Sequence, residues 1–180
     1  FSYAWLKPRS KKNSLPILEG YGRFSKSATI QNGHPSGGVA LYYKSTFKRR
    51  VLKLQTCRKH NILWVKLMST TGTSDLVLGI VYCRNAIPNY ELEIENFYEQ
   101  LTADTIKFSS DSDVLLVGDF NARLGSLTGD HGVNNNKTPF LAFTHTAQLD
   151  NLNIGCAKGV YTYSHPSKEA RSIIDYGLIT

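Results

Sequence analysis

The chain has 180 residues, with 21 lysines and arginines against 14 aspartates and glutamates, and a net charge of +7. This length predicts one domain with a buried core, and no apolar run approaches the roughly 20 residues of a membrane-spanning helix. Three scattered cysteines without a Cys-x-x-Cys pair argue against a zinc site and favour a reducing compartment, nuclear or cytoplasmic. The excess of basic residues favours a polyanionic partner.

The first half of the chain carries strand patterns separated by turn signals. Strands are predicted at 38–43, 50–55, 61–68 and 75–83, with turns at Asn32-Gly33, Gly37-Gly38 and Thr71-Gly72. The segment 75–83 is apolar almost throughout, which is typical of a strand buried on both faces. Cys83 at its end is interpreted as a small buried hydrophobe.

Helical and strand patterns alternate in the second half. Apolar residues at helical spacing predict a helix over 90–108, and several glutamates fall in its first turns, where the helix dipole favours acids. A strand is predicted over 113–118. Thr138 and Pro139 are typical of an N-cap and a first helical residue, and they predict a second helix to about Leu149.

Three short strands are predicted to close the sequence, at 152–154, 160–163 and 172–179. No internal repeat or long linker divides the chain. Early hairpins followed by strand–helix–strand units therefore predict an α/β fold of two packed sheets with outer helices.

Residues 114–122, Val-Leu-Leu-Val-Gly-Asp-Phe-Asn-Ala, combine a buried strand with polar side chains at its end. Gly118 frees the backbone. Because residues i and i+2 of an extended segment point to the same side, Asp119 and Asn121 are predicted to converge at the C-terminal edge of a sheet. An acid that shuttles a proton, beside an amide that holds an oxygen, suits hydrolysis of a phosphate ester. The alternative is that both residues only cap a turn.

A second acid lies inside the apolar segment Ser172-Ile173-Ile174-Asp175-Tyr176. A charge at such a position costs free energy unless it is paired. The alternative is an edge-strand acid that faces water.

Seven short segments follow one another in a recognisable order: Trp5-Leu6-Lys7-Pro8, 15–21, Ser36-Gly37-Gly38-Val39-Ala40, 78–82, Gly118-Asp119-Phe120-Asn121-Ala122-Arg123, Thr162-Tyr163 and 172–176. In this order and spacing, the chain resembles the endonuclease/exonuclease/phosphatase superfamily, and most closely the endonuclease domain of non-LTR (LINE-type) retrotransposons. The resemblance covers nearly all 180 residues. It implies a DNase I-like four-layer α/β sandwich, in which two packed mixed β-sheets are flanked by helices.

The resemblance also implies catalytic roles for four residues. Asp119 matches the acid that activates the attacking water or protonates the leaving oxygen, and Asn121 matches the residue that orients the scissile phosphate. Tyr82 matches a strand-end tyrosine that hydrogen-bonds the phosphate, although a core or rim aromatic is the alternative. Asp175 matches the carboxylate that orients a catalytic histidine.

The implied reaction is hydrolysis of a phosphodiester bond in DNA with Mg²⁺ (or Mn²⁺). Thr162 matches a polar residue near the site, and Arg123, Lys168 and Arg171 are the candidate phosphate contacts. The basic clusters of the chain, such as Lys48-Arg49-Arg50, are open to the alternative of a solvated surface. In a retrotransposon, a reverse transcriptase domain would lie downstream.

The chain departs from the family pattern in two ways. Tyr3 occupies the slot of the metal-binding glutamate, and a phenol is a poor ligand for a hard cation. The segment with the catalytic histidine would lie beyond Thr180, and the first family strand would lie before Phe1. These departures predict a single domain, 1–180, truncated at both ends, with no identified replacement for the metal ligand. The positions of Glu19 and Asp130 in the sequence give no reason to assign either as the metal ligand. His131 is interpreted as a solvated loop residue.

Two alternatives to a DNA-nicking endonuclease remain at the sequence level. The chain could be a superfamily phosphatase, because the Gly-Asp-Phe-Asn segment is common to both. Alternatively, it is a catalytically impaired nucleic-acid-binding relic, for which Tyr3 is the main support.

Overall fold

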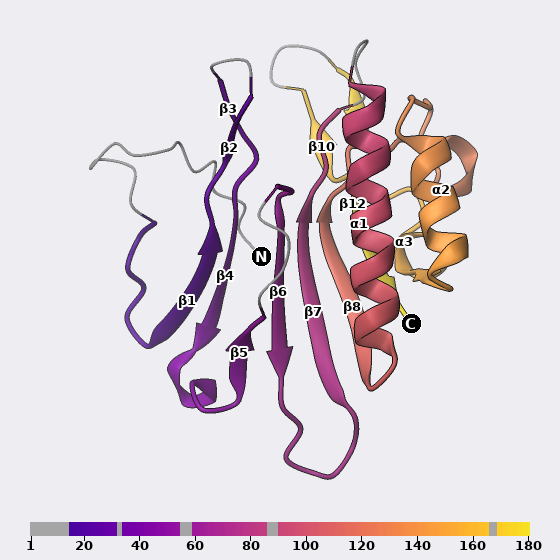
Figure 1. Cartoon of the computed structure of the whole chain (residues 1–180). Helices are drawn as coiled ribbons and strands as arrows, with labels where there is room; N and C mark the ends of the chain where they lie inside the picture. The colour runs from indigo at the N-terminus through magenta and orange to yellow at the C-terminus, as the bar shows by residue number, and fades with distance from the viewer. Residues whose placement is uncertain (1–14, 32–33, 55–58, 86–89, 166–168) are drawn as a thin grey trace.

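The computed structural model describes residues 15–31, 34–54, 59–85, 90–165 and 169–180. A six-stranded mixed sheet forms the centre of the molecule, in the order β5-β6-β7-β8-β12-β9 (Figure 1). Within it, β7 and β8 are parallel and the other neighbours are antiparallel. The strands are β5 (Val51–Lys53), β6 (Ile62–Leu67), β7 (Asp75–Tyr82), β8 (Ser112–Asp119), β9 (Asp150–Asn151) and β12 (Asp175–Ile179).

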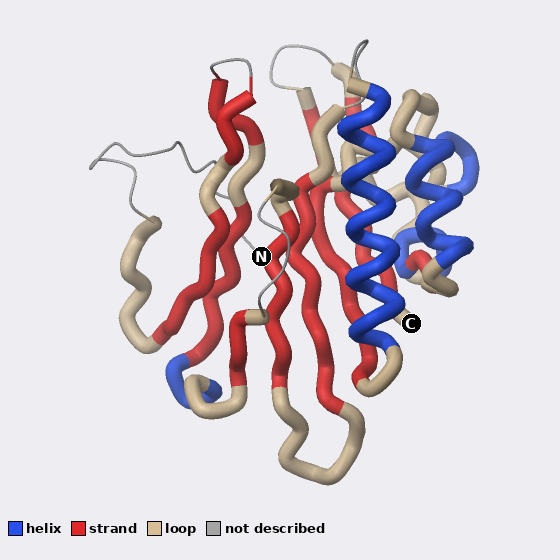
Figure 2. The backbone as a smooth tube through the Cα atoms, viewed as in Figure 1, coloured by secondary structure: helices blue, strands red, loops and turns tan. Residues whose placement is uncertain are grey.

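The helices cover one face of this sheet (Figure 2). They are α1 (Glu91–Ser109), which connects β7 to β8, α2 (Lys137–Thr146) and the short α3 (Leu152–Gly155). The core between helices and sheet is aromatic and aliphatic, and Trp64, Leu101 and Phe140 are fully buried in it. The Trp64 indole N–H donates to a carboxylate oxygen of Asp104 on α1 at 3.0 Å, so this large side chain is buried with its polar atom satisfied.

A second sheet packs on the opposite face of the six-stranded sheet. It consists of β1 (Tyr21–Lys26) and β4 (Val39–Lys44), paired antiparallel. Val39 and Leu41 of β4 share a buried cluster with Val65, Leu78 and Ile80 of the central strands. The remaining elements of this region are the hairpin β2 (Thr29–Gln31) and β3 (His34–Ser36) and the 3-10 turn η1 (Ser45–Phe47).

Strand alternation divides the side chains of β7 between the two cores. Val77 and Val81 belong to the core under the helices, whereas Leu78 and Ile80 belong to the core between the sheets. This division explains why the segment is apolar at nearly every position. Beyond the sheet lie η2 (Gly125–Leu127) and a small hairpin of β10 (Tyr163–Ser164) and β11 (Arg171–Ser172).

The predicted α/β class, with two packed sheets and flanking helices, is confirmed, and the described residues contribute a helical layer on the six-stranded sheet. Among the described residues, no helix has both the length and the apolar character required to cross a bilayer. Cys83 is buried, as predicted. The strands predicted at 38–43, 61–68, 75–83 and 113–118 and the helix at 90–108 form within one or two residues of the expected bounds, and β5 is shorter than its prediction at 50–55.

Several predictions in the second half are wrong. The segment 152–154 is helical, because the Asn151 side chain accepts a hydrogen bond from the backbone N–H of Asn153 and caps α3. The predicted strand 160–163 is extended only at its end, in β10, and the predicted strand 172–179 is divided between β11 and β12.

The second helix also differs from its prediction, because it begins at Lys137 and ends at Thr146. Its N-cap is Asn136, not Thr138, and the Asn136 side chain makes no capping bond. Its amide donates instead to the backbone oxygens of Arg84, at 2.8 Å, and Phe120, at 3.1 Å, which ties together the segments that follow β7 and β8.

Candidate active site

Three of the predicted site residues form one row across the central sheet. Tyr82 at the end of β7 pairs with Asp119 at the end of β8, and Asp119 pairs with Asp175 at the start of β12. Directly paired residues of neighbouring strands point to the same face of a sheet. Leu78, Ile80 and Tyr82 stand at every second position of β7, so their side chains point to the same face. Because Leu78 and Ile80 pack against the second sheet, the row lies on the face that the second sheet covers.

Gly118 is required by the approach of β7 to β8. A Cβ atom at this position would lie 2.0 Å from the backbone oxygen of Val81, and the φ of Gly118 is 152°. Only glycine can adopt this φ and lie this close to Val81 without displacing the neighbouring strand. Gly118 therefore allows the row to form immediately after it.

Asn121 reaches the site through a turn, not through strand alternation as the sequence predicted. Its φ of 48° is left-handed, a conformation that asparagine tolerates better than most residues. Its backbone N–H donates to the Asp119 carboxylate at 2.8 Å, and its side-chain amide donates to the backbone oxygen of Cys83 at 2.8 Å. The two residues thus converge, but because a bonded turn brings them together.

The row opens into a cavity of about 480 Å³ that Tyr82, Asp119, Asn121 and Asp175 all line. The structure therefore brings together the four residues that the sequence predicted as catalytic. The rest of the lining comes from the loop before β4, the β10–β11 hairpin and nearby loops, through Gly37, Gly38, Asn85, Arg123, Asn134, Tyr163, Ser172 and Ile174.

The position of Gly37, just before β4, requires a glycine. With a φ of 77°, it lies so close to the ring of Tyr82 that a Cβ would approach the ring to 2.7 Å. Any larger residue would press on the tyrosine that lines the cavity. The Gly37-Gly38 segment, predicted only as a turn, therefore also forms a wall of the site.

The two carboxyl groups of the row are held in an environment that favours their protonated forms. Burial raises the pKa of Asp119 to about 7, the negative charge of Asp175 adds to the rise, and the hydrogen bonds from Asn121 oppose it. Burial likewise raises the pKa of Asp175, while the Thr162 hydroxyl lowers it. Asp119 is therefore an acid that can both hold and release a proton near neutral pH.

Thr162 supports Asp175. Its hydroxyl oxygen accepts hydrogen bonds from the backbone N–H groups of Ile174 and Asp175, each at 3.1 Å. The backbone oxygen of Asp175 accepts a hydrogen bond from the side chain of Asn153 at 3.0 Å. Asp175 is half-buried, so the alternative of an edge-strand acid facing water does not hold.

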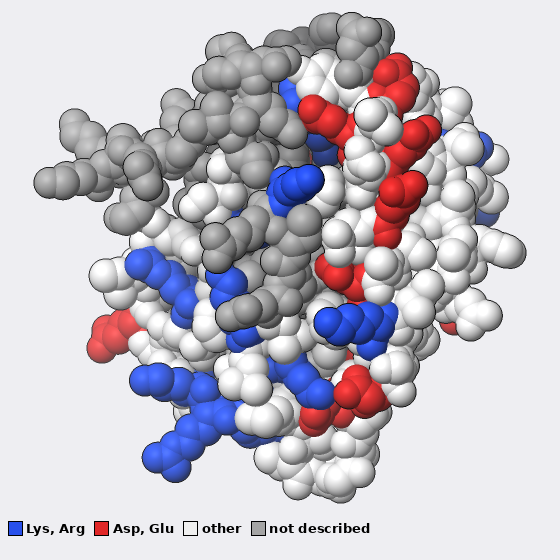
Figure 3. All heavy atoms as spheres, viewed as in Figure 1, with Lys and Arg blue, Asp and Glu red and all other residues white. Residues whose placement is uncertain are grey.

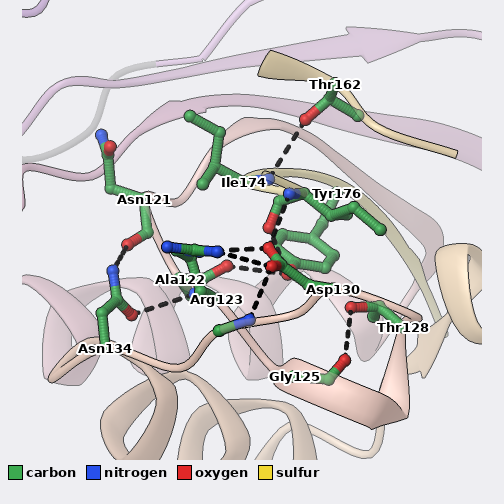
Figure 4. A network of polar contacts seen from close by, with 12 residues as sticks. Asn121, Ala122, Arg123, Gly125, Thr128, Asp130, Asn134, Thr162, Ile174 and Tyr176 are labelled. Atoms are coloured by element: carbon green, nitrogen blue, oxygen red, sulfur yellow. Dashed lines mark hydrogen bonds and ion pairs between the residues drawn. The ribbon is translucent and has the colours of Figure 1, made fainter. Parts of the chain in front are cut away.

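Asp130 forms a buried hub beside the cavity (Figure 4). Its carboxylate accepts hydrogen bonds from the Arg123 guanidinium, at 2.7 and 3.2 Å, and from the backbone N–H groups of Gly132 and Ile173. Burial alone would raise the pKa of Asp130, but these donors hold it below its usual value. Asp130 therefore joins its own loop to Ile173, the residue that follows β11, and its charge is paired with that of Arg123.

This hub changes the interpretation of Arg123. The sequence presented Arg123 as a phosphate contact, and the structure places it at the cavity but paired with Asp130, with its side chain 33% exposed. Asn134 completes the arrangement, because it accepts from the backbone N–H of Arg123 and donates to the backbone oxygen of Asn121. The long polar loop has no periodic pattern that indicates these contacts, so sequence reasoning assigned no role to Asp130 and did not single out Asn134.

The other predicted residues lie apart from this cavity or outside the described residues. Arg171 is exposed and pairs with Ser164 in the β10–β11 hairpin; both line a separate hollow with His131, Tyr161 and Glu169. His131 is exposed, as predicted for a loop histidine. Tyr3 and Lys168 lie outside the described residues. Among the residues described, no group of three or more histidine, cysteine or acidic side chains could hold a metal ion.

A family model, the Endonuclease/Exonuclease/phosphatase family, matches residues 4–176. The chain belongs to this family. Its known members include endonucleases, exonucleases and phosphatases, as the family name states, so the row and its cavity lie in a family of phosphate-ester hydrolases. No curated protein sequence matches the chain significantly.

Several solved structures have the same fold. The endonuclease domain of TRAS1, a telomere-specific non-LTR retrotransposon, is 18% identical, with a TM-score of 0.65 over 91% of this chain and 68% of that chain. The AP endonuclease LMAP from Leishmania major is 12% identical, with a TM-score of 0.73 over 91% and 63%. The catalytic domain of Xenopus laevis APE2 is 16% identical, with a TM-score of 0.61 over 91% and 67%. The chain thus spans about two thirds of the length of these structures.

Proposed function

We propose that this chain hydrolyses phosphodiester bonds in a divalent-metal-dependent reaction, and that its substrate is DNA, which it nicks as a retrotransposon endonuclease domain. The observation that carries the proposal is the row of Tyr82, Asp119 and Asp175 at the wall of one cavity, with Asn121 beside it. Family membership supports phosphate-ester hydrolysis, and the fold shared with the TRAS1 endonuclease domain favours a DNA substrate.

Asp119 would handle the proton of the reaction. With a pKa of about 7, both of its protonation states are populated at neutral pH. As a carboxylate, it would accept a proton from the water that attacks phosphorus; as an acid, it would protonate the oxygen that leaves when the P–O bond breaks. Either transfer requires the group to face the cavity, as Asp119 does.

Tyr82 and Asn121 would position the phosphate. The tyrosine hydroxyl can donate to a phosphate oxygen, and the asparagine turn fixes a polar side chain beside Asp119. Because Asn121 is already bonded to Cys83 and Asn134, its orientation is set before substrate binds. Such preorganised dipoles stabilise charge that develops at phosphorus.

The donor set fits a magnesium ion, because Mg²⁺ prefers carboxylate oxygens and is commonly held by one or two carboxylates together with substrate phosphates. Asp175 would supply one carboxylate, and Asp119 a second when it is deprotonated. Mg²⁺ or Mn²⁺ bound there would polarise the phosphate and offset its negative charge. A bound cation would also offset the negative charge of Asp175, which disfavours the charged form of Asp119.

The surface charge supports a nucleic-acid substrate. The chain has a net charge of +7, and phosphate contacts by lysine and arginine supply most sequence-independent affinity for DNA. The proposed contacts are Arg171, the first residue of β11, and Lys168, which precedes it in the sequence. Arg123 would contact phosphate only through the part of its guanidinium that Asp130 leaves exposed.

The deciding experiment is nicking of supercoiled plasmid by the 180-residue chain, with Mg²⁺ and with EDTA. We expect nicking that requires Mg²⁺ and that Asp119→Asn reduces by about 100-fold or more, which is the scale of general acid–base catalysis. A matched control is Asp150→Asn, an exposed acid at β9, which should leave nicking unchanged. Circular dichroism of each variant separates loss of chemistry from loss of fold.

The same samples distinguish the alternatives. Release of inorganic phosphate from an inositol phosphate without plasmid nicking would assign a phosphatase. Plasmid binding without cleavage in the presence of Mg²⁺ would assign a nucleic-acid-binding relic. Nicking that persists in Asp119→Asn would contradict the assignment of Asp119.

A further inference from the structure

The helical face of the molecule carries a groove that the proposed chemistry does not use. The groove lies between α1 and α2 and encloses about 800 Å³. Ile94, Tyr98 and Phe143 form its buried floor, and Ala142 and the half-exposed Ile106 extend its apolar surface to the rim. None of the residues that line the candidate active site takes part in it.

One rim of the groove is acidic. Glu91, Glu95 and Glu99 line it at intervals of four residues, so their side chains form a single stripe along α1. All three are exposed, and neither of the two ion pairs found among the described residues involves them. Figure 3 shows the acidic side chains gathered along α1, whereas lysines and arginines gather around the ends of β4 and β5.

The stripe is unusual for this chain. Four of the six glutamates in the sequence fall between positions 91 and 99, in a protein with a net charge of +7. Like charges four residues apart repel one another on a helix, and this repulsion opposes the favourable interaction of the first-turn glutamates with the helix dipole. A cationic partner laid along the groove would reverse that effect.

We propose that the α1–α2 groove is a docking site for a basic amphipathic helix of a protein partner. The lining residues Glu91 to Ile106 span about 22 Å at 1.5 Å per residue, which is roughly four turns of a bound helix. Apolar side chains of the partner would fill the floor, and its lysines or arginines would face the glutamate stripe. This is the mode in which an amphipathic helix binds a hydrophobic groove.

The acidic rim excludes nucleic acid as the occupant, because the glutamates repel phosphates. The groove also lies on the face of the sheet opposite to the one from which Tyr82 and Asp119 project. A partner held in the groove therefore leaves the candidate active site open, and both can be occupied at the same time.

The proposal is tested with a fluorescein-labelled amphipathic peptide of about 16 leucines and lysines, against a matched peptide with glutamate in place of each lysine. We expect the lysine peptide to bind the 180-residue chain at least about tenfold more tightly than the glutamate peptide. Hydrogen exchange should show protection of α1 and α2 in the complex, with the β10–β11 hairpin unchanged.

Two charge-matched variants assign the binding to the stripe. Glu95→Lys combined with Glu99→Lys should weaken lysine-peptide binding by about tenfold or more. Glu19→Lys combined with Asp111→Lys makes the same change in net charge at exposed positions outside the groove and should change binding by less than about twofold. Ala142→Asp, which places a charge on the apolar surface, should also weaken it, and circular dichroism verifies that each variant is folded.

Several outcomes would overturn the proposal. They are absence of lysine-peptide binding, equal binding of the two peptides, equal losses in the two charge-matched variants, and protection mapped to another surface. A dimer in light scattering that Glu95→Lys with Glu99→Lys dissociates would assign the groove to a second copy of the chain.

Discussion

Asp119 shows how one environment can set both chemistry and stability. Its carboxyl group is held beside Asp175 in a half-buried row, and its pKa rises from 3.8 to about 7. The folded chain therefore binds more protons than the unfolded chain between these two pH values. Stability from this group is fully present below about pH 3.8 and is lost as the pH rises through about 7.

We predict that Asp119→Asn removes this pH dependence. The upper limit of the effect is about 4 kcal/mol in the free energy of unfolding, since one pKa unit corresponds to about 1.4 kcal/mol. Urea titrations in EDTA from pH 4 to 8 should show the difference in unfolding free energy between the variant and the unaltered chain growing with pH. Parallel curves for the two proteins would contradict the raised pKa.

Gly118 offers a second prediction at the scale of one residue. Gly118→Ala should lower the free energy of unfolding by at least about 2 kcal/mol, because its Cβ would collide with the backbone oxygen of Val81. Gly155→Ala is the matched control, since no atom of the described residues lies within 4 Å of its added Cβ and glycine disfavours helices. Equal thermal midpoints for the two variants would show that β7 and β8 can separate to admit a side chain.

Among the elements, long apolar or periodic segments were predictable and short ones were not. The strands β7 and β8 and the helix α1 each carry a pattern many residues long, and their bounds followed from the sequence. The segment Leu152–Gly155 is too short for its period to be read, and a single side-chain bond from Asn151 decides that it is helical. β1 has few apolar residues and, among the described strands, pairs with β4 alone, so its sequence gave no clear strand pattern.

The segment between β8 and α2 depends on side-chain amides. Asn136 is fully buried, and its amide donates to two backbone oxygens that follow β7 and β8. These contacts join residues far apart in the sequence, so no local pattern could have predicted them. They explain why the side chain of Asn136, the N-cap residue of α2, makes no capping bond to its own helix.

We predict that Asn136→Ala destabilises the chain by about 1–3 kcal/mol, because two carbonyl oxygens would lose their donor in a buried setting. Asn135→Ala, at the exposed neighbouring position, should change the free energy of unfolding by less than about 0.5 kcal/mol. Chemical denaturation of both variants measures the difference. Similar values would mean that water replaces the Asn136 amide.

For the molecule as a whole, the sequence predicted the members of the site better than their geometry. Asp119, Asn121, Tyr82 and Asp175 all line one cavity, as the family resemblance implied. The sequence could not show that Asp130 would be buried against Arg123, because a buried pair within a polar loop leaves no periodicity. It also could not show that Arg171 lines a different hollow from the four candidate catalytic residues.

The distribution of charge over the molecule leads to a prediction for DNA binding. Arg171→Glu should weaken DNA binding. It should also reduce the magnitude of the negative slope of log affinity against log salt by about one, because it removes one phosphate contact. Lys107→Glu, at the exposed end of α1, changes the net charge equally and should leave that slope unchanged. Fluorescence anisotropy with a DNA duplex at several salt concentrations measures both, and equal slopes would remove Arg171 from the interface.

The position of β12 also bears on how the chain folds. This strand follows all other described strands in the sequence, yet it lies in the sheet between β8 and β9. Until it arrives, one side of β8 is an unpaired edge, a ready template for pairing with other chains. During synthesis, the row of acids is completed only when Asp175 joins Asp119, so a chain released too early would have an aggregation-prone strand where the finished protein has its site.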